Sequence, residues 1–233
     1  MWATLQRDLE AVRQRDPAAR SSTEIVLCYP GVHAVWGHRV AHRLWRAGHP
    51  LAARMCSAVT RVLTGVDIHP SARLGQGLFI DHATGVVIGA TAEVGDDVTI
   101  YQGVTLGGTT LDSGKRHPTV GDRVTIGAGA KILGPISIGA DSRIGANAVV
   151  VKPVPPNSVV VGVPGQVIAR SRPRPASAPP DLDDTLMPDL MGTSLQSLRR
   201  RVDELEAAVN GQTTRHDARP SEGGVWAGED FSI

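Results

Sequence analysis

A six-residue repeat is the feature that most constrains the fold of this chain. Apolar residues occupy every sixth position along two runs, which are Ile88, Val94, Ile100 and Leu106, and then Val120, Ile126, Ile132, Ile138, Ile144 and Val150. Gly often follows the apolar residue, and a small or branched residue stands four places after it. Neither the 3.6-residue period of a helix nor the two-residue period of a strand explains this spacing. Three six-residue faces instead make a triangular coil of about 18 residues with the apolar positions inside.

The repeat begins earlier, at Ile68, Leu74 and Ile80, and it is interrupted twice. Two extra residues enter within 81–85, before the repeat resumes. A second insertion forms a loop over 107–119, which is rich in Gly, Thr and Ser. Because the repeat itself is scaffold, we expect function to be placed at these interruptions.

The sequence divides into five segments. An N-terminal helical domain is expected over 1–64, followed by the coil domain over 65–170. A Pro- and Ser-rich linker over 171–192 leads to a short heptad helix over 193–209, and 210–233 is a Gly-rich, flexible tail. Amphipathic spacing predicts the helices of the first segment through three stripes, which are Leu5, Leu9 and Val12; Val32, Val35, Trp36, Val40, Leu44 and Trp45; and Leu51 to Leu63.

The heptad segment has apolar residues that alternate by three and four, which are Leu195, Leu198, Val202, Leu205 and Val209. Thr193 and Gln196 form a plausible capping box at its start. Two heptads are too short to be stable alone. The segment is therefore either a helix that supports an oligomer or an amphipathic helix that lies on its own subunit.

Composition excludes several classes of protein. The net charge of +1 gives no basic field for nucleic acid or an anionic membrane. The apolar runs are too short to span a bilayer, and the charged N-terminus does not resemble a signal peptide. Cys28 and Cys56 form no metal or redox motif, so we expect buried free thiols in a cytosolic protein.

The first interruption holds the candidate base. His82 follows Asp81 directly, and an imidazole is well suited to take a proton near neutral pH. Asp67 precedes His82 by roughly one coil, so its carboxylate can plausibly fix the tautomer of the imidazole. Spacing alone leaves an ordinary surface histidine as the alternative.

The second interruption carries Arg116 and His117 beside Pro118. A guanidinium next to an imidazole suits a small carboxylate, although a solvated basic loop is the alternative. His33, His38 and His42 lack the Glu of a zinc-protease helix and are expected to be satisfied or surface histidines.

At these positions the chain resembles the serine O-acetyltransferases of the hexapeptide-repeat acyltransferase superfamily. The resemblance covers about residues 15–170. It rests on several segments at family-like spacing, which are RDPA at 15–18, GVHA at 31–34, DIHP at 67–70, DHATG at 81–85, VTLGG at 104–108, RHP at 116–118, IGAGAKILG at 126–134 and GVP at 162–164.

The resemblance implies a mainly β fold, a left-handed parallel β-helix after an N-terminal α-helical domain. It implies a cytoplasmic enzyme of cysteine biosynthesis that moves the acetyl group of acetyl-CoA to the hydroxyl of L-serine. Acetyl-CoA is a co-substrate, and neither a metal nor a resident cofactor is expected. Feedback inhibition by L-cysteine is also implied. Active sites would lie between neighbouring subunits of a homotrimer; longer members join two trimers through extra helices, which the short helical region here lacks.

Roles for single residues follow from the same resemblance. His82 would be the general base, and Asp67 would orient it. Other expected contacts are those to the serine amino and hydroxyl end (Asp16, Asp81), to its carboxylate (Arg116, His117) and to acetyl-CoA (Gly108, Thr109, Ala128, Ala146). No matched motif contains an acyl-accepting Cys or Ser, which favours direct transfer.

Two further positions concern the family pattern. Ala90 stands where members often carry Glu, which puts a supporting contact near the site in doubt. The C-terminal Ile233 matches the terminal isoleucine that members insert into O-acetylserine sulfhydrylase, and a disordered end without a partner is the alternative.

Three rival functions agree less well with these residues. An acyltransferase acting on a sugar or an antibiotic would not need the amino-acid contacts. A β-helical zinc carbonic anhydrase would need His69, His82 and His117 to converge. A scaffold without activity would leave both interruptions without a purpose.

Overall fold

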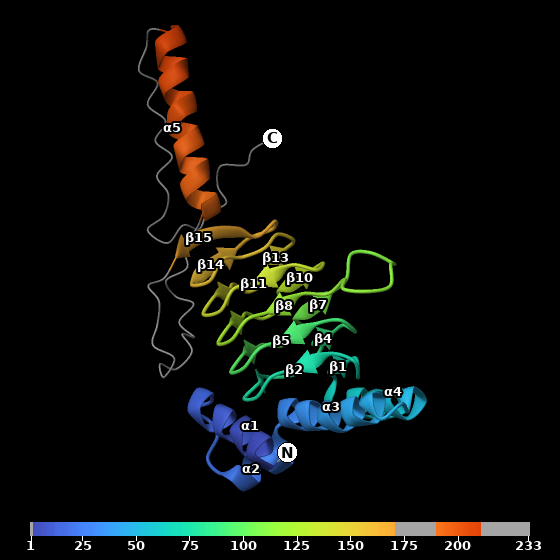
Figure 1. The fold of residues 1–233 in the computed structure, drawn as a ribbon. Coiled ribbons are helices and arrows are strands. Elements are labelled where there is room, and N and C mark those ends of the chain that lie inside the picture. Colours follow the sequence, from blue (N-terminus) through green and yellow to red (C-terminus); the bar gives the residue numbers. More distant parts are fainter. Residues whose placement is uncertain (1, 171–189, 211–233) are drawn as a thin grey trace. The chain divides into compact units, whose positions relative to one another are not determined.

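The computed structural model describes residues 2–170 and 190–210, which belong to two units, Met1–Thr185 and Leu186–Ile233. The first unit begins with four helices (Figure 1), which are α1 (Trp2–Arg15), α2 (Ser22–Cys28), α3 (Pro30–Arg46) and α4 (Pro50–Thr64). The second unit contains α5 (Leu190–Asn210). Pro occupies the first turn of α3 and of α4, where its missing N–H is not needed. The expected linker (171–192) and tail (210–233) lie almost wholly outside the described residues.

Short parallel strands form the three faces of a β-helix (Figure 1). Sheet A contains β1 (Asp67–Ile68), β4 (Val87–Ile88), β7 (Thr105–Gly107), β10 (Lys131–Leu133) and β13 (Val149–Val150). Sheet B contains β2 (Arg73–Leu74), β5 (Glu93–Val94), β8 (Thr119–Val120) and β11 (Ser137–Ile138). Sheet C contains β3 (Phe79–Ile80), β6 (Thr99–Ile100), β9 (Thr125–Ile126), β12 (Arg143–Ile144), β14 (Ser158–Val161) and β15 (Gln166–Arg170). The expected left-handed parallel β-helix with an N-terminal helical domain is confirmed.

The apolar positions of the repeat form the core. Ile88 pairs with Leu106 and Leu106 pairs with Ile132 on sheet A, so that equivalent residues of successive coils stack on one another. All ten residues from Ile88 to Val150 that define the period are buried. The chain turns from sheet A to B, from B to C and from C to A at three corners, which we call the A–B, B–C and C–A corners.

The two ends of the coil are finished differently. At the far end β15 runs antiparallel to β14 and stops the parallel ladder. At the near end α4 packs on β1, and α3 packs on β3. The buried Asp8 of α1 accepts two hydrogen bonds from Arg39 of α3 and one from the backbone N–H of Gly77, which joins both helices to the first coil.

The helices that the three stripes predict are present as α1, α3 and α4. Burial differs from expectation on one face of α4 and at both cysteines, which were expected to be buried. Leu51, Met55 and Val59 of the third stripe are exposed in the single chain, because α4 packs through the small residues Ala53 and Ser57. Cys28 is exposed at the end of α2, and Cys56 is only half-buried.

The heptad helix differs from its expected start. Helix α5 begins at Leu190, so Thr193 lies inside it and cannot be its N-cap. The apolar stripe from Leu195 to Val209 is exposed.

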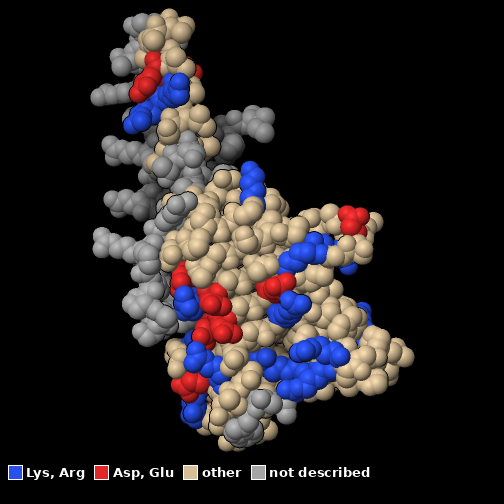
Figure 2. Space-filling view, in the orientation of Figure 1, with Lys and Arg blue, Asp and Glu red and all other residues tan. Residues whose placement is uncertain are grey.

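Positive and negative side chains share the surface. Figure 2 shows Lys and Arg gathered over α3 and the neighbouring coils, with an acidic group close by. Among the described residues, no helix is both long and apolar enough to cross a membrane.

His38 gives a testable prediction about stability. Burial, followed by the charges of His42 and Arg39, lowers the pKa of His38 to about 3. Below pH 6.5 the unfolded chain therefore takes up a proton that the native state refuses, so this group lowers stability as pH falls from 6.5 towards 3. One such proton is worth about 1.4 kcal/mol per pH unit. We expect the unfolding free energy of His38→Gln, measured by urea titration between pH 6.5 and 4.5, to fall less steeply with acid than that of the wild type. The exposed His49→Gln is the control, and equal slopes for all three proteins would contradict the prediction.

Candidate functional site

The C–A corner between β3 and β4 presents His82. The two extra residues make this corner wider than its neighbours, and His82 and Ala83 both have left-handed backbone (φ 54° and 52°). Two consecutive non-glycine residues in this region store strain, which is typical of functional sites. The His82 side chain is 75% exposed, and its Nε2 lies 4.0 Å from Asp81 Oδ2. The strained turn therefore holds an accessible imidazole beside a carboxylate.

Asp16 and Tyr29 complete this group. The Tyr29 hydroxyl donates a 2.6 Å hydrogen bond to Asp16 Oδ2, and the backbone N–H of Ala18 donates to Oδ1 at 2.8 Å. Burial raises the pKa of Asp81 against the opposing charge and backbone hydrogen bond of His82, and the charge of Asp16 adds a smaller upward effect. Burial and the hydrogen bond to Asp16 raise the pKa of Tyr29 to about 12. Two carboxylates and a histidine thus meet at this corner.

Gly31 explains how α3 brings Tyr29 to the corner. A Cβ at position 31 would overlap the carbonyl oxygen of Ile80, the last residue of β3. Only glycine allows the start of α3 to approach this strand so closely. Tyr29 lies just before α3 and Asp81 just after β3, so this contact sets their separation.

The structure places Asp67 beside the same corner but gives its carboxylate another partner. The backbone N–H of Asp67 donates to Val86 in the turn that follows His82. The Oδ2 atom of Asp67 lies 3.4 Å from Arg61 of α4. The expected contact with His82 is absent from the hydrogen bonds and ion pairs of residues 2–170.

The A–B corner holds Arg116 and His117. The Thr91 hydroxyl accepts hydrogen bonds from the backbone N–H groups of Arg116 (3.0 Å) and His117 (3.2 Å). The same oxygen lies 2.9 Å from His117 Nδ1, to which the Thr91 backbone N–H also donates. Because donors surround Nδ1, the neutral ring carries its proton on Nε2.

The His117 ring is buried against Gly89, in a position that we call its seat, and burial favours its neutral form. Its ring is 7% exposed and lies against Gly89. Burial, with the charges of Arg116 and Lys115 in support, lowers the pKa of His117. The neutral Nε2–H lies against Gly89 and is a hydrogen-bond donor within reach of the charge of Arg116, a combination that suits a carboxylate. The Arg116 guanidinium itself donates from Nη1 to the carbonyl oxygen of Thr110 at 3.3 Å.

The remaining expected residues divide between the same two corners. Ala128 and Ala146 follow His82 up the C–A corner, where each coil bonds to the one below, as Gly103 does to Thr84 and Asn147 does to Ala128. Gly108 and Thr109 lie on the A–B corner, where Gly108 faces Arg116 and Thr109 faces Gly134. Sheet A separates these two corners. One chain therefore does not bring the His82 group and the Arg116 group together.

Three residues were missing from the expected site. Tyr29 contacts Asp16, Thr91 organises both members of the Arg116 pair, and His69 lies near His117. Ser71 bridges His69 Nδ1 and the carbonyl oxygen of Ala90, so backbone supplies a contact at the position where the family often has Glu. The sequence did contain a signal for Thr91 and His69, since both lie at corners of the repeat, where functional residues are expected.

A metal site is not formed by the described part of this chain. No three His, Cys, Asp or Glu residues within it come together as metal ligands. His33 and His42 each contact a backbone carbonyl oxygen, of Val26 and Pro70 respectively. The three histidines of the carbonic anhydrase alternative are divided between two corners.

Gly89→Ala tests the seat of His117. The added methyl would collide with the imidazole, so we expect the ring to leave its seat and its pKa to rise towards the ordinary value of about 6.5. An NMR titration of labelled histidines measures this change. Gly107→Ala, on the next coil, is the control because its methyl would meet the flexible end of Leu133. An unchanged His117 titration in Gly89→Ala would contradict the close contact between Gly89 and the imidazole.

Comparisons with known proteins agree with this geometry. The family model for the bacterial transferase hexapeptide (six repeats) matches residues 117–152. The serine acetyltransferase of Mycobacterium tuberculosis is 64% identical over 233 residues, covering 100% of both chains. The structure of Neisseria gonorrhoeae serine acetyltransferase in complex with serine superposes with a TM-score of 0.70 at 46% identity, covering 72% of this chain and 69% of that one. That of the Brucella abortus enzyme with coenzyme A gives a TM-score of 0.72 at 48% identity, covering 73% and 69%. The chain belongs to the serine acetyltransferase family.

Proposed function

We propose that this chain transfers the acetyl group of acetyl-CoA to the hydroxyl of L-serine by direct attack, with His82 as general base. The observation that carries the proposal is the C–A corner, where an exposed histidine on strained backbone lies beside two carboxylates. His82 takes the proton of the serine hydroxyl as its oxygen attacks the thioester carbonyl. The C–O bond forms, the C–S bond breaks, and protonated His82 returns the proton to the leaving CoA thiolate.

Asp67 is proposed to orient the His82 ring. Its carboxylate lies beside the turn that follows His82 and now contacts the exposed Arg61. An exposed ion pair of this kind contributes little, so exchange of Arg61 for a protonated imidazole costs little. The role requires rotation of the His82 side chain, which its exposure allows.

Recognition of serine follows from its zwitterionic form. Asp16 and Asp81 supply negative charge for the ammonium group, and Arg116 with the Nε2–H of His117 supplies donors for the carboxylate. A sugar or an antibiotic acceptor would not need both a contact for an ammonium group and a contact for a carboxylate. This complementarity favours an amino acid over the other acceptors of the superfamily.

The position of these groups supports an assembly of several copies. Since the ammonium and carboxylate contacts occupy different corners of one chain, a complete site needs the C–A corner of one copy and the A–B corner of another. A homotrimer closes such heterologous contacts into a ring. The same division applies to the proposed acetyl-CoA contacts, with Ala128 and Ala146 on one corner and Gly108 and Thr109 on the other.

Regulation, partners and location complete the proposal. Cysteine differs from serine by sulfur in place of oxygen, so it would occupy the same contacts and inhibit the enzyme. Ile233, outside the described residues, is proposed to bind O-acetylserine sulfhydrylase through its side chain and free carboxylate. We place the enzyme in the cytoplasm, where its substrates are made.

His82→Ala tests the reaction and the base together. We expect serine-dependent release of CoA thiol from acetyl-CoA by the wild type, and a fall in kcat of about 10²–10⁴-fold in the variant. His49→Ala removes an exposed histidine elsewhere and should keep full activity. Equal turnover by His82→Ala and wild type would refute the assigned base, and thiol release that ignores serine would refute the substrate.

Mixing two inactive variants tests the shared site. Co-expression of His82→Ala and Arg116→Gln chains with different tags should restore activity, because about a quarter of the interfaces in randomly mixed rings would carry both intact corners. As a control, wild type is co-expressed with a chain that carries both substitutions. This mixture shows the activity that remains when inactive chains only dilute active ones. Mixed trimers that stay as inactive as the pure variants would place all contacts within one copy.

A further inference from the structure

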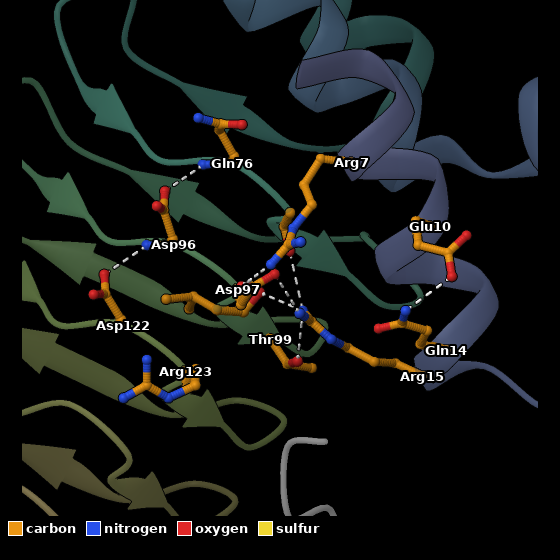
Figure 3. A network of polar contacts seen from close by, with 12 residues as sticks. Arg7, Glu10, Gln14, Arg15, Gln76, Asp96, Asp97, Thr99, Asp122 and Arg123 are labelled. Carbon is orange, nitrogen blue, oxygen red and sulfur yellow. Dashed lines mark hydrogen bonds and ion pairs between the residues drawn. The ribbon is translucent and has the colours of Figure 1, made fainter. Parts of the chain in front are cut away.

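The end of α1 is fixed to the β-helix by a buried arginine. Arg15, the last residue of α1, has a side chain that is 3% exposed. Its Nη1 donates to the carbonyl oxygens of Gly77 (3.0 Å) and Val98 (3.2 Å) and to Thr99 Oγ1 (3.3 Å). Its Nη2 donates to Asp97 Oδ1 at 3.1 Å (Figure 3). One guanidinium thus joins the helix to two successive coils.

A contribution to stability is a weak explanation for this buried arginine. Burial lowers the pKa of the Arg15 guanidinium, with the charge of Asp97 opposing the effect. Its Nε is buried without a hydrogen-bond partner among the described atoms. Apolar residues of similar size commonly replace buried charged groups without loss of stability. A buried cation with an unpaired N–H is therefore better explained by the geometry that it imposes.

That geometry concerns the next residue, Asp16. Pro17 ends the helix, so the position of Asp16 depends on the last turn that Arg15 anchors. The anchor also leads to the other carboxylate of the corner. Gly77 lies just before β3, and Asp81 lies just after it. Through one short strand, Arg15 therefore sets the separation of the Asp16 backbone from Asp81 and His82.

Tyr29 fixes the Asp16 side chain from the opposite direction. Its hydroxyl donates to Oδ2, while the backbone N–H of Ala18 donates to Oδ1. Each carboxylate oxygen therefore keeps a lone pair in a set direction. Such support determines whether a binding group stays within about 0.5 Å of its productive position.

We propose that Arg15 and Tyr29 are positioning residues for the serine ammonium group, acting through Asp16. Arg15 holds the backbone of Asp16 at the C–A corner, and Tyr29 holds its carboxylate. The inference rests on the proposed function, in which Asp16 binds that ammonium group. It implies that loss of either residue weakens the binding of serine and leaves acetyl-CoA binding and the chemical step unchanged.

The test compares Arg15→Lys and Tyr29→Phe with Arg7→Gln. Arg15→Lys keeps the charge but loses the two-pronged contact, and Tyr29→Phe removes one hydroxyl. We expect the KM for serine to rise roughly tenfold in both, with kcat and the KM for acetyl-CoA within about twofold of wild type. Arg7 bonds the other oxygen of Asp97 at 2.6 Å but lies about two helical turns before the end of α1, so Arg7→Gln should behave as wild type. A loss of kcat without a change in the KM for serine would overturn the proposal.

A double-mutant cycle tests whether the effect passes through Asp16. In an Asp16→Asn background, adding Arg15→Lys or Tyr29→Phe should change the KM for serine by less than about twofold. Full additivity would overturn the proposal. Should Arg15→Lys fail to fold by circular dichroism, the Tyr29→Phe cycle decides alone.

Measurements on the wild type and on Asp16→Asn distinguish a failure of the proposed function from a failure of this inference. Absence of serine-dependent thiol release, or an Asp16→Asn variant with normal serine binding, would refute the function or the role of Asp16. A normal KM for serine in Tyr29→Phe, beside a raised KM in Asp16→Asn, would refute only the positioning.

Discussion

The stack of inward-facing apolar residues is the interaction on which the rest of the structure depends. Each coil places an Ile, Leu or Val over its equivalent in the coil below, about 4.8 Å away, while parallel hydrogen bonds satisfy the backbone. The interior is narrow, which fits an aromatic content of 3%. The chain can change length only where it leaves the stack, at a corner. Both interruptions of the repeat are corners, and both hold the residues of the proposed site.

The architecture could be predicted from the sequence because its signal is local and repeated. Spacing alone predicts that Ile88, Ile100 and Ile126 are buried, and all three are fully or almost fully buried. The supporting contacts could not be found in this way. Thr91 bonds a residue 26 positions away, and Arg15 bonds one 83 positions away. The first separation is not a multiple of the period, and Arg15 lies outside the repeat, so only the folded chain reveals these pairs.

Spacing also failed where it could not say which face of an element is turned inward. Helix α4 is amphipathic, yet it packs on α3 and β1 through Ala53 and Ser57 and leaves Leu51 and Val59 exposed. For Asp67 the spacing was informative but incomplete, and its proposed contact with His82 stays a prediction. The interval of about one coil correctly brings its backbone beside the turn after His82, but Arg61 of the preceding helix takes the carboxylate. Periodicity locates a residue along the coil and does not choose among the partners that surround it.

The elements at the two ends of the coil affect whether copies of the protein can stack on one another. A parallel β-helix with open ends offers unpaired strands on which another copy can stack, and such stacking leads to fibres. Here the antiparallel β15 ends the parallel ladder of sheet C at one end, while α3 and α4 pack on the first coil at the other. The shared site proposed above requires the other kind of contact, side by side and corner to corner. The elements that end the stack thus favour the lateral contact that this proposal needs.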